Sequence, residues 1–143
     1  STNEITKIYS SFVQWQYFCV LSNGNVLMSN YGGNGLLLYD VTSNEITRVH
    51  ISGAFSFFYT LPNGNVLLSV AGGSTYGIYL YDITTNKASW IYTTGYSWDT
   101  FVPDENGVTI SSSTHPDQGS VYYDYATGSV TPVEEESELS LVA

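Results

Sequence analysis

Short apolar runs alternate with polar turn residues along the whole chain of 143 residues. In the middle of the chain these runs cover residues 55–60, 66–70, 77–82 and 88–92, and Pro, Gly, Asn and Asp residues separate them. The runs are rich in Val, Ile, Thr and aromatic residues, and they lack the i, i+3, i+4 spacing of an amphipathic helix. The pattern therefore predicts four short strands that tight turns join into an antiparallel meander.

The same pattern recurs at a fixed interval. The stretch LSNGNVLMSNYGG at residues 21–33 returns as LPNGNVLLSVAGG at residues 61–73. A second stretch occurs as TNEITKIY, SNEITRVH, TNKASWIY and TGSVTPVE, and it places equivalent residues 41 or 42 positions apart at Asn3, Asn44, Asn86 and Gly128. A four-stranded unit with this period is typical of a β-propeller blade.

These repeats predict an all-β repeat protein of three four-stranded antiparallel meander units, which form one domain over residues 1–143. The units are expected at about residues 11–51, 52–93 and 94–135. A spare strand is expected at residues 3–9, and an acidic tail at residues 134–143. Because propellers normally close with four or more blades, three units predict an open arc or one part of a larger ring.

Two kinds of residue are expected to shape the turns. Asn-Gly pairs between apolar runs predict type I′ hairpins, in which both central residues have positive φ. An Asp that follows a Tyr opens the turn before each fourth strand, and its side chain is suited to accept hydrogen bonds from the amides of that turn. The neighbouring sequence lacks the partners that a metal site or a catalytic site would need. The predicted structural turn residues are Asn23, Gly24, Asn63, Gly64, Asn106, Gly107, Asp40, Asp82 and Asp124.

The middle unit resembles a kelch-type repeat. In that family a glycine doublet ends the second strand, a Tyr-Asp pair leads into the third turn, and a Trp lies on the fourth strand. The middle unit matches at Gly72-Gly73, Tyr81-Asp82 and Trp90. The first unit keeps the doublet and the Tyr-Asp pair but has Arg48 in place of the Trp, and the third unit keeps only Tyr123-Asp124. The resemblance implies a β-propeller. It also implies a remote alternative, a fragment of a galactose-oxidase-like copper enzyme.

The residues themselves predict no enzyme. The two histidines, His50 and His115, and the single cysteine, Cys19, fall in separate segments, and no recognised catalytic or metal-binding motif is present. Cys19 lies in an aromatic run and is expected to be a buried structural thiol. We therefore expect no catalytic residue, no metal and no cofactor.

Charge restricts the partners. The formal net charge is −10, and the only basic residues are Lys7, Arg48 and Lys87, so no basic cluster is available to neutralise phosphates. Nucleic acid and anionic membranes are therefore poor partners, and no apolar stretch predicts membrane insertion. Few charges combined with many Ser, Thr, Asn and Tyr residues indicate an extracellular protein or one on a cell or virion surface.

The expected open arc favours an interaction or assembly module. Exposed apolar faces and a spare strand would need covering, either by a second copy in a dimeric ring or filament, or by the rest of a larger propeller. The predicted assembly strand consists of Glu4, Ile5, Thr6, Lys7, Ile8 and Tyr9.

A glycan-binding propeller is the alternative. Aromatic rings stack on sugar rings, although large aromatic residues also fill β cores. The candidate ligand-binding residues are Trp15, Trp90, Trp98, Tyr31, Tyr76 and the loop residue His115.

Overall fold

The computed structural model describes residues 15–30, 35–50, 53–70, 77–92 and 98–133. These residues form three antiparallel four-stranded sheets, each with its strands in chain order. The only helical element in the described part is a 3-10 turn, η1, at Pro116–Gln118. The predicted all-β repeat of four-stranded meander units is therefore confirmed.

The strands of the first sheet are β1 (Tyr17–Val20), β2 (Val26–Ser29), β3 (Leu36–Asp40) and β4 (Glu45–His50). Those of the second sheet are β5 (Phe55–Thr60), β6 (Val66–Val70), β7 (Ile78–Asp82) and β8 (Lys87–Tyr92). Those of the third sheet are β9 (Thr100–Pro103), β10 (Gly107–Ser111), β11 (Ser120–Asp124) and β12 (Val130–Pro132). In the second sheet, β7 begins one residue later than predicted and β8 begins one residue earlier.

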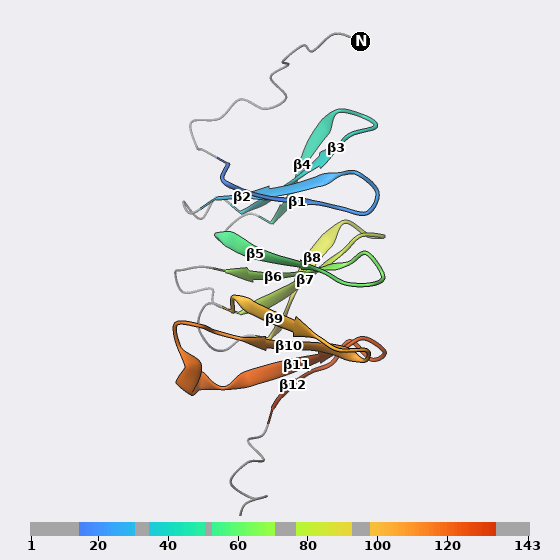
Figure 1. Ribbon diagram of the computed structural model, residues 1–143. Helices are drawn as coiled ribbons and strands as arrows, with labels where there is room; N and C mark the ends of the chain where they lie inside the picture. The colour runs from blue at the N-terminus through green and yellow to red at the C-terminus, as the bar shows by residue number, and fades with distance from the viewer. Residues whose placement is uncertain (1–14, 31–34, 51–52, 71–76, 93–97, 134–143) are drawn as a thin grey trace, which may run out of the picture.

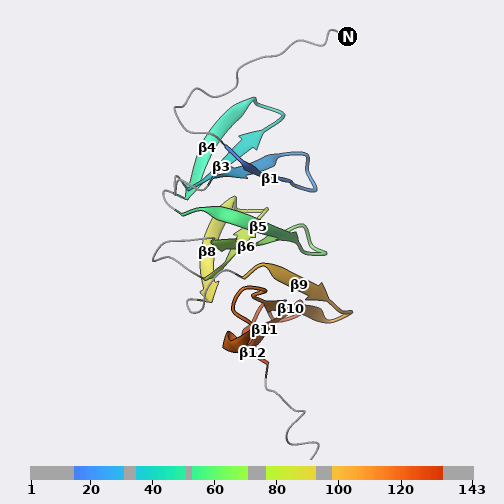
Figure 2. The same ribbon diagram turned by 60° about the vertical axis from the view of Figure 1, so that its left-hand side comes forward.

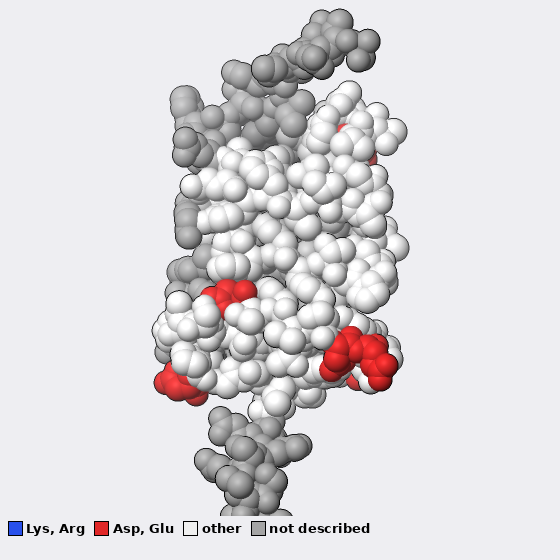
Figure 3. Space-filling view, viewed as in Figure 1, with Lys and Arg blue, Asp and Glu red and all other residues white. Residues whose placement is uncertain are grey.

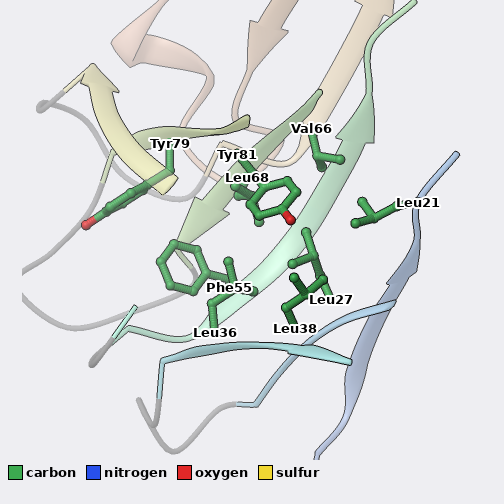
Figure 4. Packing of buried hydrophobic residues seen from close by; sticks show 9 residues of the cluster. All are labelled: Leu21, Leu27, Leu36, Leu38, Phe55, Val66, Leu68, Tyr79 and Tyr81. Carbon is green, nitrogen blue, oxygen red and sulfur yellow. The ribbon is translucent and has the colours of Figure 1, made fainter. Parts of the chain in front are cut away.

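The three sheets are stacked in chain order, with β5–β8 between the other two (Figures 1 and 2). One apolar cluster fills the space between the first and second sheets (Figure 4). A second cluster fills the space between the second and third sheets. Strand β6 contributes to both, because Leu68 faces the first sheet and Leu67 faces the third. The continuous apolar run of this strand follows from burial on both of its faces.

A buried serine forms a hydrogen bond across each joint, that is, each contact between successive sheets. The Ser29 hydroxyl accepts a hydrogen bond from the Phe55 backbone N–H at 2.9 Å and donates to the Gly35 carbonyl at 2.7 Å. The Ser69 hydroxyl accepts from the Trp98 N–H at 2.9 Å. Both serines are fully buried. The second strand of each of the first two sheets is therefore linked to the start of the next sheet by a repeated polar contact.

The predicted type I′ turns are wrong. Backbone bonds from Leu21 to Asn25 and from Gly24 to Leu21 close a three-residue loop, and the second hairpin has the same bonds. Only the glycine at the end of each loop has positive φ, at 90° for Gly24 and 93° for Gly64. A type I turn followed by a left-handed glycine has these features. The third hairpin is one residue shorter, and the Asp104 carboxylate accepts from the amides of Asn106 and Gly107.

Candidate functional site

A tyrosine–asparagine pair stabilises the turn before the fourth strand in the first two sheets. The Tyr39 hydroxyl donates to Asn44 Oδ1 at 2.6 Å, and the Tyr81 hydroxyl donates to Asn86 Oδ1 at the same distance. Both asparagines have positive φ, 60° and 57°, which Asn adopts more readily than most residues. The repeat therefore uses this position both to form the turn and to bond the tyrosine hydroxyl.

The third sheet has lost half of this pair. Gly128 stands at the asparagine position and keeps the positive φ, 71°, but it offers no side-chain acceptor. Tyr123 is only 5% exposed, and its hydroxyl has no hydrogen-bond partner among the described residues. Burial raises the pKa of Tyr123. Because its hydroxyl lacks an internal acceptor, this position differs physically from the two equivalent ones.

Tyr123 lines a cavity of about 100 Å³ at the hairpin end of the joint between the second and third sheets. Leu61, Pro62 and Asn63 form the side contributed by the β5–β6 hairpin, and Tyr123 and Tyr125 form the other side. Asn63 Oδ1 accepts from the Asn65 N–H at 3.0 Å, which orients the side chain and leaves its amide nitrogen as a donor. The cavity is therefore mainly apolar, with polar groups at Asn63 and Tyr123.

Tyr125 interacts with a tyrosine of the neighbouring sheet. Burial, followed by the interaction with Tyr59, raises the pKa of Tyr125. Tyr59 in turn stacks on Phe101, with ring centroids 5.3 Å apart. At the equivalent place in the first joint, Ile83 takes the position of Tyr125, and the Tyr81 hydroxyl is already bonded. The combination of an aromatic wall and an unpartnered hydroxyl thus distinguishes the second joint from the first.

The surroundings of the cavity are acidic. In the view of Figure 3 the acidic side chains lie mostly over the third sheet, and no Lys or Arg is visible. Residues 98–133 contain no Lys or Arg at all. Hydrogen bonds from the Asn106 amide and the Tyr122 hydroxyl lower the pKa of Asp104, so this carboxyl stays charged well into the acid range. An anion would be repelled here, so the site disfavours anionic ligands.

The predicted turn aspartates all bond their own turns. Asp40 accepts from the amides of Thr42 and Ser43. Asp82 accepts from the hydroxyl and amide of Thr84, and these bonds lower the pKa of Asp82. Asp124 accepts from the amides at positions 126 and 127. Their oxygens are thus used within the backbone of the turn.

The predicted aromatic ligands are scattered. Trp98 is 2% exposed and belongs to the second core cluster, so its ring faces the core and cannot stack on a sugar. Trp15 is half-buried beside β1. Trp90 is exposed, stacks on Tyr79, and lies so close to Gly77 that a Cβ there would collide with its Nε1. Tyr31, Tyr76 and the predicted assembly strand (residues 4–9) lie outside the described residues.

The other reactive groups serve local structure. His115 Nδ1 is 3.0 Å from the Thr114 hydroxyl, and its backbone N–H donates to Ser112. Cys19 is half-buried with its Sγ 3.9 Å from the Thr60 hydroxyl, and burial raises the pKa of the thiol. Within the described ranges no three His, Cys, Asp or Glu side chains gather where they could hold a metal ion. No helix in these ranges has the length and hydropathy required to cross a membrane.

Comparison with known proteins gives a structural neighbour but no family. No protein-family model matches the chain, and no curated protein matches it. The chain is similar to a structural genomics protein of unknown function from Bacteroides thetaiotaomicron, with a TM-score of 0.61 and 17% identity. The match covers 87% of this chain and 33% of the other, so this chain spans about a third of its neighbour's length. At this identity the likeness shows the fold alone, and the kelch-type resemblance stays a prediction.

Sequence reasoning missed the cavity. It treated Asn63 only as a turn residue and gave Leu61, Pro62 and Tyr125 no role. The feature of the sequence that could have indicated the cavity is Gly128, which replaces the asparagine of the first two units. Its meaning depends on the Tyr–Asn hydrogen bond, which a repeat alignment does not reveal.

Proposed function

We propose that this protein is a non-enzymatic interaction module that self-associates through the outer face of its first sheet. This face is defined by Phe18, Val20, Met28 and Leu37. The observation that carries the proposal is the exposure of Phe18 (56%) and Val20 (68%), two large apolar side chains on the terminal sheet of the stack. Met28 and Leu37 are buried, so the open part of the face lies along β1.

Strand register supports the assignment of these residues to one face. Phe18 lies opposite Met28, and Met28 lies opposite Leu37, so the three form a row across the sheet. Val20 is two residues further along β1 and shares the face. The adjacent row, which includes Cys19 and Leu27, packs against the second sheet. The outer face is therefore the side turned away from the rest of the stack.

The other two sheets indicate what such a face requires. The positions equivalent to Phe18 and Met28 are Phe58 and Leu68 in the second sheet, where the first sheet covers them. In the third sheet they are Phe101 and Ile110, which the second sheet covers. Burying one such side chain contributes about 1.5–3 kcal/mol. On the outer face of β1–β4, Phe18 is thus an exposed apolar side chain of the kind that is covered elsewhere in the same chain.

The opposite end of the stack is polar, which favours a two-fold contact. Across β9–β12 the outward row reads Val102, Thr109, Tyr122 and Thr131. Thr109 and Tyr122 stand where the first two sheets have leucines that face the next sheet. A head-to-tail ring or filament would press this polar face onto an apolar one. A two-fold dimer instead pairs the outer face of β1–β4 with the same face of a second copy.

The packing also supports the interpretation of the sheets as propeller blades, since consecutive four-stranded meanders stack face to face. On this proposal the chain is a short arc of blades. The first sheet has an exposed apolar patch that self-associates, and the third sheet has a polar outer face.

Mass in solution tests the self-association. Light scattering or sedimentation over a range of concentrations should show a species of twice the chain mass of 15.7 kDa. The double change Phe18→Ser and Val20→Ser should weaken the dimer at least about tenfold, because apolar burial at the contact is lost. The matched control is Val102→Ser, which removes a side chain of similar exposure (58%) from the opposite end.

Three results would count against the proposal. A monomer at every concentration would contradict the proposal. Equal weakening of the dimer by Val102→Ser would also contradict it. Loss of association on deletion of residues 1–10, with Phe18 and Val20 intact, would assign the contact to the predicted assembly strand instead.

A further inference from the structure

We infer that the cavity lined by Leu61, Pro62, Asn63, Tyr123 and Tyr125 binds the acetamido group of a neutral N-acetylated sugar. The inference is independent of the proposed self-association, because the cavity lies at the joint between the second and third sheets and shares no residue with the outer face of β1–β4.

The polar groups of the cavity favour a ligand that forms hydrogen bonds. Tyr123 is only 5% exposed, and its hydroxyl lacks the asparagine partner that Tyr39 and Tyr81 have. This hydroxyl is not among the fully enclosed polar atoms without a partner, so it still meets open space. A purely apolar occupant would leave it unsatisfied, whereas a carbonyl oxygen would accept its proton. The Asn63 amide nitrogen supplies a second donor.

The apolar walls and the small volume of the cavity favour a small group with an apolar end. Leu61 and Pro62 offer carbon surface against which a methyl group can pack. Sites for drug-sized ligands usually enclose about 300–1,000 Å³, so a cavity of about 100 Å³ takes one substituent and not a whole ligand. An acetamido group combines a methyl, a carbonyl oxygen and an N–H within such a space. A plain sugar hydroxyl would leave the apolar walls facing water.

The surroundings select the rest of the ligand. Tyr125 is half-buried, so part of its ring is accessible to the C–H face of a sugar ring. The absence of Lys and Arg from residues 98–133, together with the charged Asp104, disfavours acidic N-acetylated sugars. N-acetylglucosamine is therefore a suitable probe. Glucose, which lacks the acetamido group, is its control, and N-acetyl-lysine carries the same group on a peptide side chain.

The test is a titration of the full chain with each probe, followed by calorimetry or by NMR shifts. N-acetylglucosamine should bind, while glucose and N-acetyl-lysine should bind at least about tenfold more weakly. Gly128→Asn should weaken N-acetylglucosamine binding by about tenfold or more without unfolding the chain, because it restores the internal partner of Tyr123 at a φ that Asn44 and Asn86 already adopt. Tyr123→Phe should give the same loss.

Matched controls exist in the first joint. Tyr81→Phe removes a hydroxyl that is bonded to Asn86 and should leave sugar binding unchanged. Asn63→Asp keeps the acceptor for the Asn65 amide but removes the donor, so it should weaken binding, whereas Asn23→Asp in the equivalent hairpin should not.

Several outcomes would overturn the inference: no binding of N-acetylglucosamine, equal binding of glucose, or wild-type affinity in Gly128→Asn. Binding of N-acetyl-lysine alone would overturn the sugar as the source of the group. The double change Phe18→Ser and Val20→Ser should leave N-acetylglucosamine binding intact, so failure of the dimer and failure of the sugar site can be told apart.

Discussion

Single hydroxyl groups decide much of how the repeats differ. Ser29 and Ser69 hold successive sheets together, and both are fully buried. Tyr81 bonds within its turn, whereas Tyr123, its equivalent, has lost its acceptor. A buried polar group stabilises when bonded and costs free energy when not, so exchange of one partner residue can change the role of a whole position.

Replacement of Ser69 with Ala tests the joint at this scale. The buried Trp98 N–H would lose its acceptor, and we expect the free energy of unfolding to fall by about 1–3 kcal/mol. Ser111 is the matched control, because it is the equivalent residue in the third sheet and is only half-buried. Ser111→Ala should change stability by less than about 0.5 kcal/mol. Equal effects in urea denaturation would show that the Ser69–Trp98 bond contributes nothing special.

At the scale of the element, hairpins are tied to the turns beside them. The Asn25 side chain accepts from the Val41 N–H at 3.1 Å, and Asn65 accepts from Ile83 at the same distance. In the third sheet, which lacks this asparagine, the Asn106 backbone carbonyl accepts from Tyr125 instead. Each sheet thus forms its two hairpin ends as one connected structure.

Gly64→Val tests the hairpin. Gly64 has a φ of 93°, and an added Cβ would lie 2.9 Å from the Ser22 hydroxyl. Both effects should destabilise the protein, by roughly 1–3 kcal/mol in thermal or urea unfolding. Gly119→Val is the comparison, since Gly119 has a similar φ of 86° but no neighbour within 4 Å of an added Cβ. An equal loss in both variants would assign the cost to the backbone alone.

The strands were predictable because alternating apolar residues and turn residues determine them locally. The hairpin type was not, because Asn-Gly suits both a type I′ turn and the observed three-residue loop, and the closing bonds from Leu21 and Leu61 choose between them. The cavity was also beyond prediction. It requires the β5–β6 hairpin to lie beside Tyr123, and stacking of the sheets sets that contact.

At the scale of the whole molecule, two apolar joints unite three sheets that individually have little core. Tyr81 belongs to the first joint, where its side chain is fully buried, and Tyr123 belongs to the second joint. Because both joints contain buried tyrosines, stability of the entire stack should depend on pH in the alkaline range.

Alkaline unfolding tests this dependence. Burial, with the nearby Asp82 charge, raises the pKa of Tyr81 from 10.0 to about 12. A tyrosine whose pKa is higher in the folded state stabilises fully below its unfolded pKa, so stability should be lost as pH rises from about 10 towards 12. Tyr81→Phe should make urea midpoints less dependent on pH in this window. An unchanged dependence would locate the titration elsewhere.

The middle sheet differs from its neighbours in one respect that matters for engineering. Its two faces are both apolar, and it receives the Ser29 hydroxyl from one side while it presents Ser69 to the other. It therefore carries both halves of the same joint and is compatible with itself. Copies of this segment could be inserted in tandem between the terminal sheets, and each copy would add one interface of known composition to an array whose length is freely chosen.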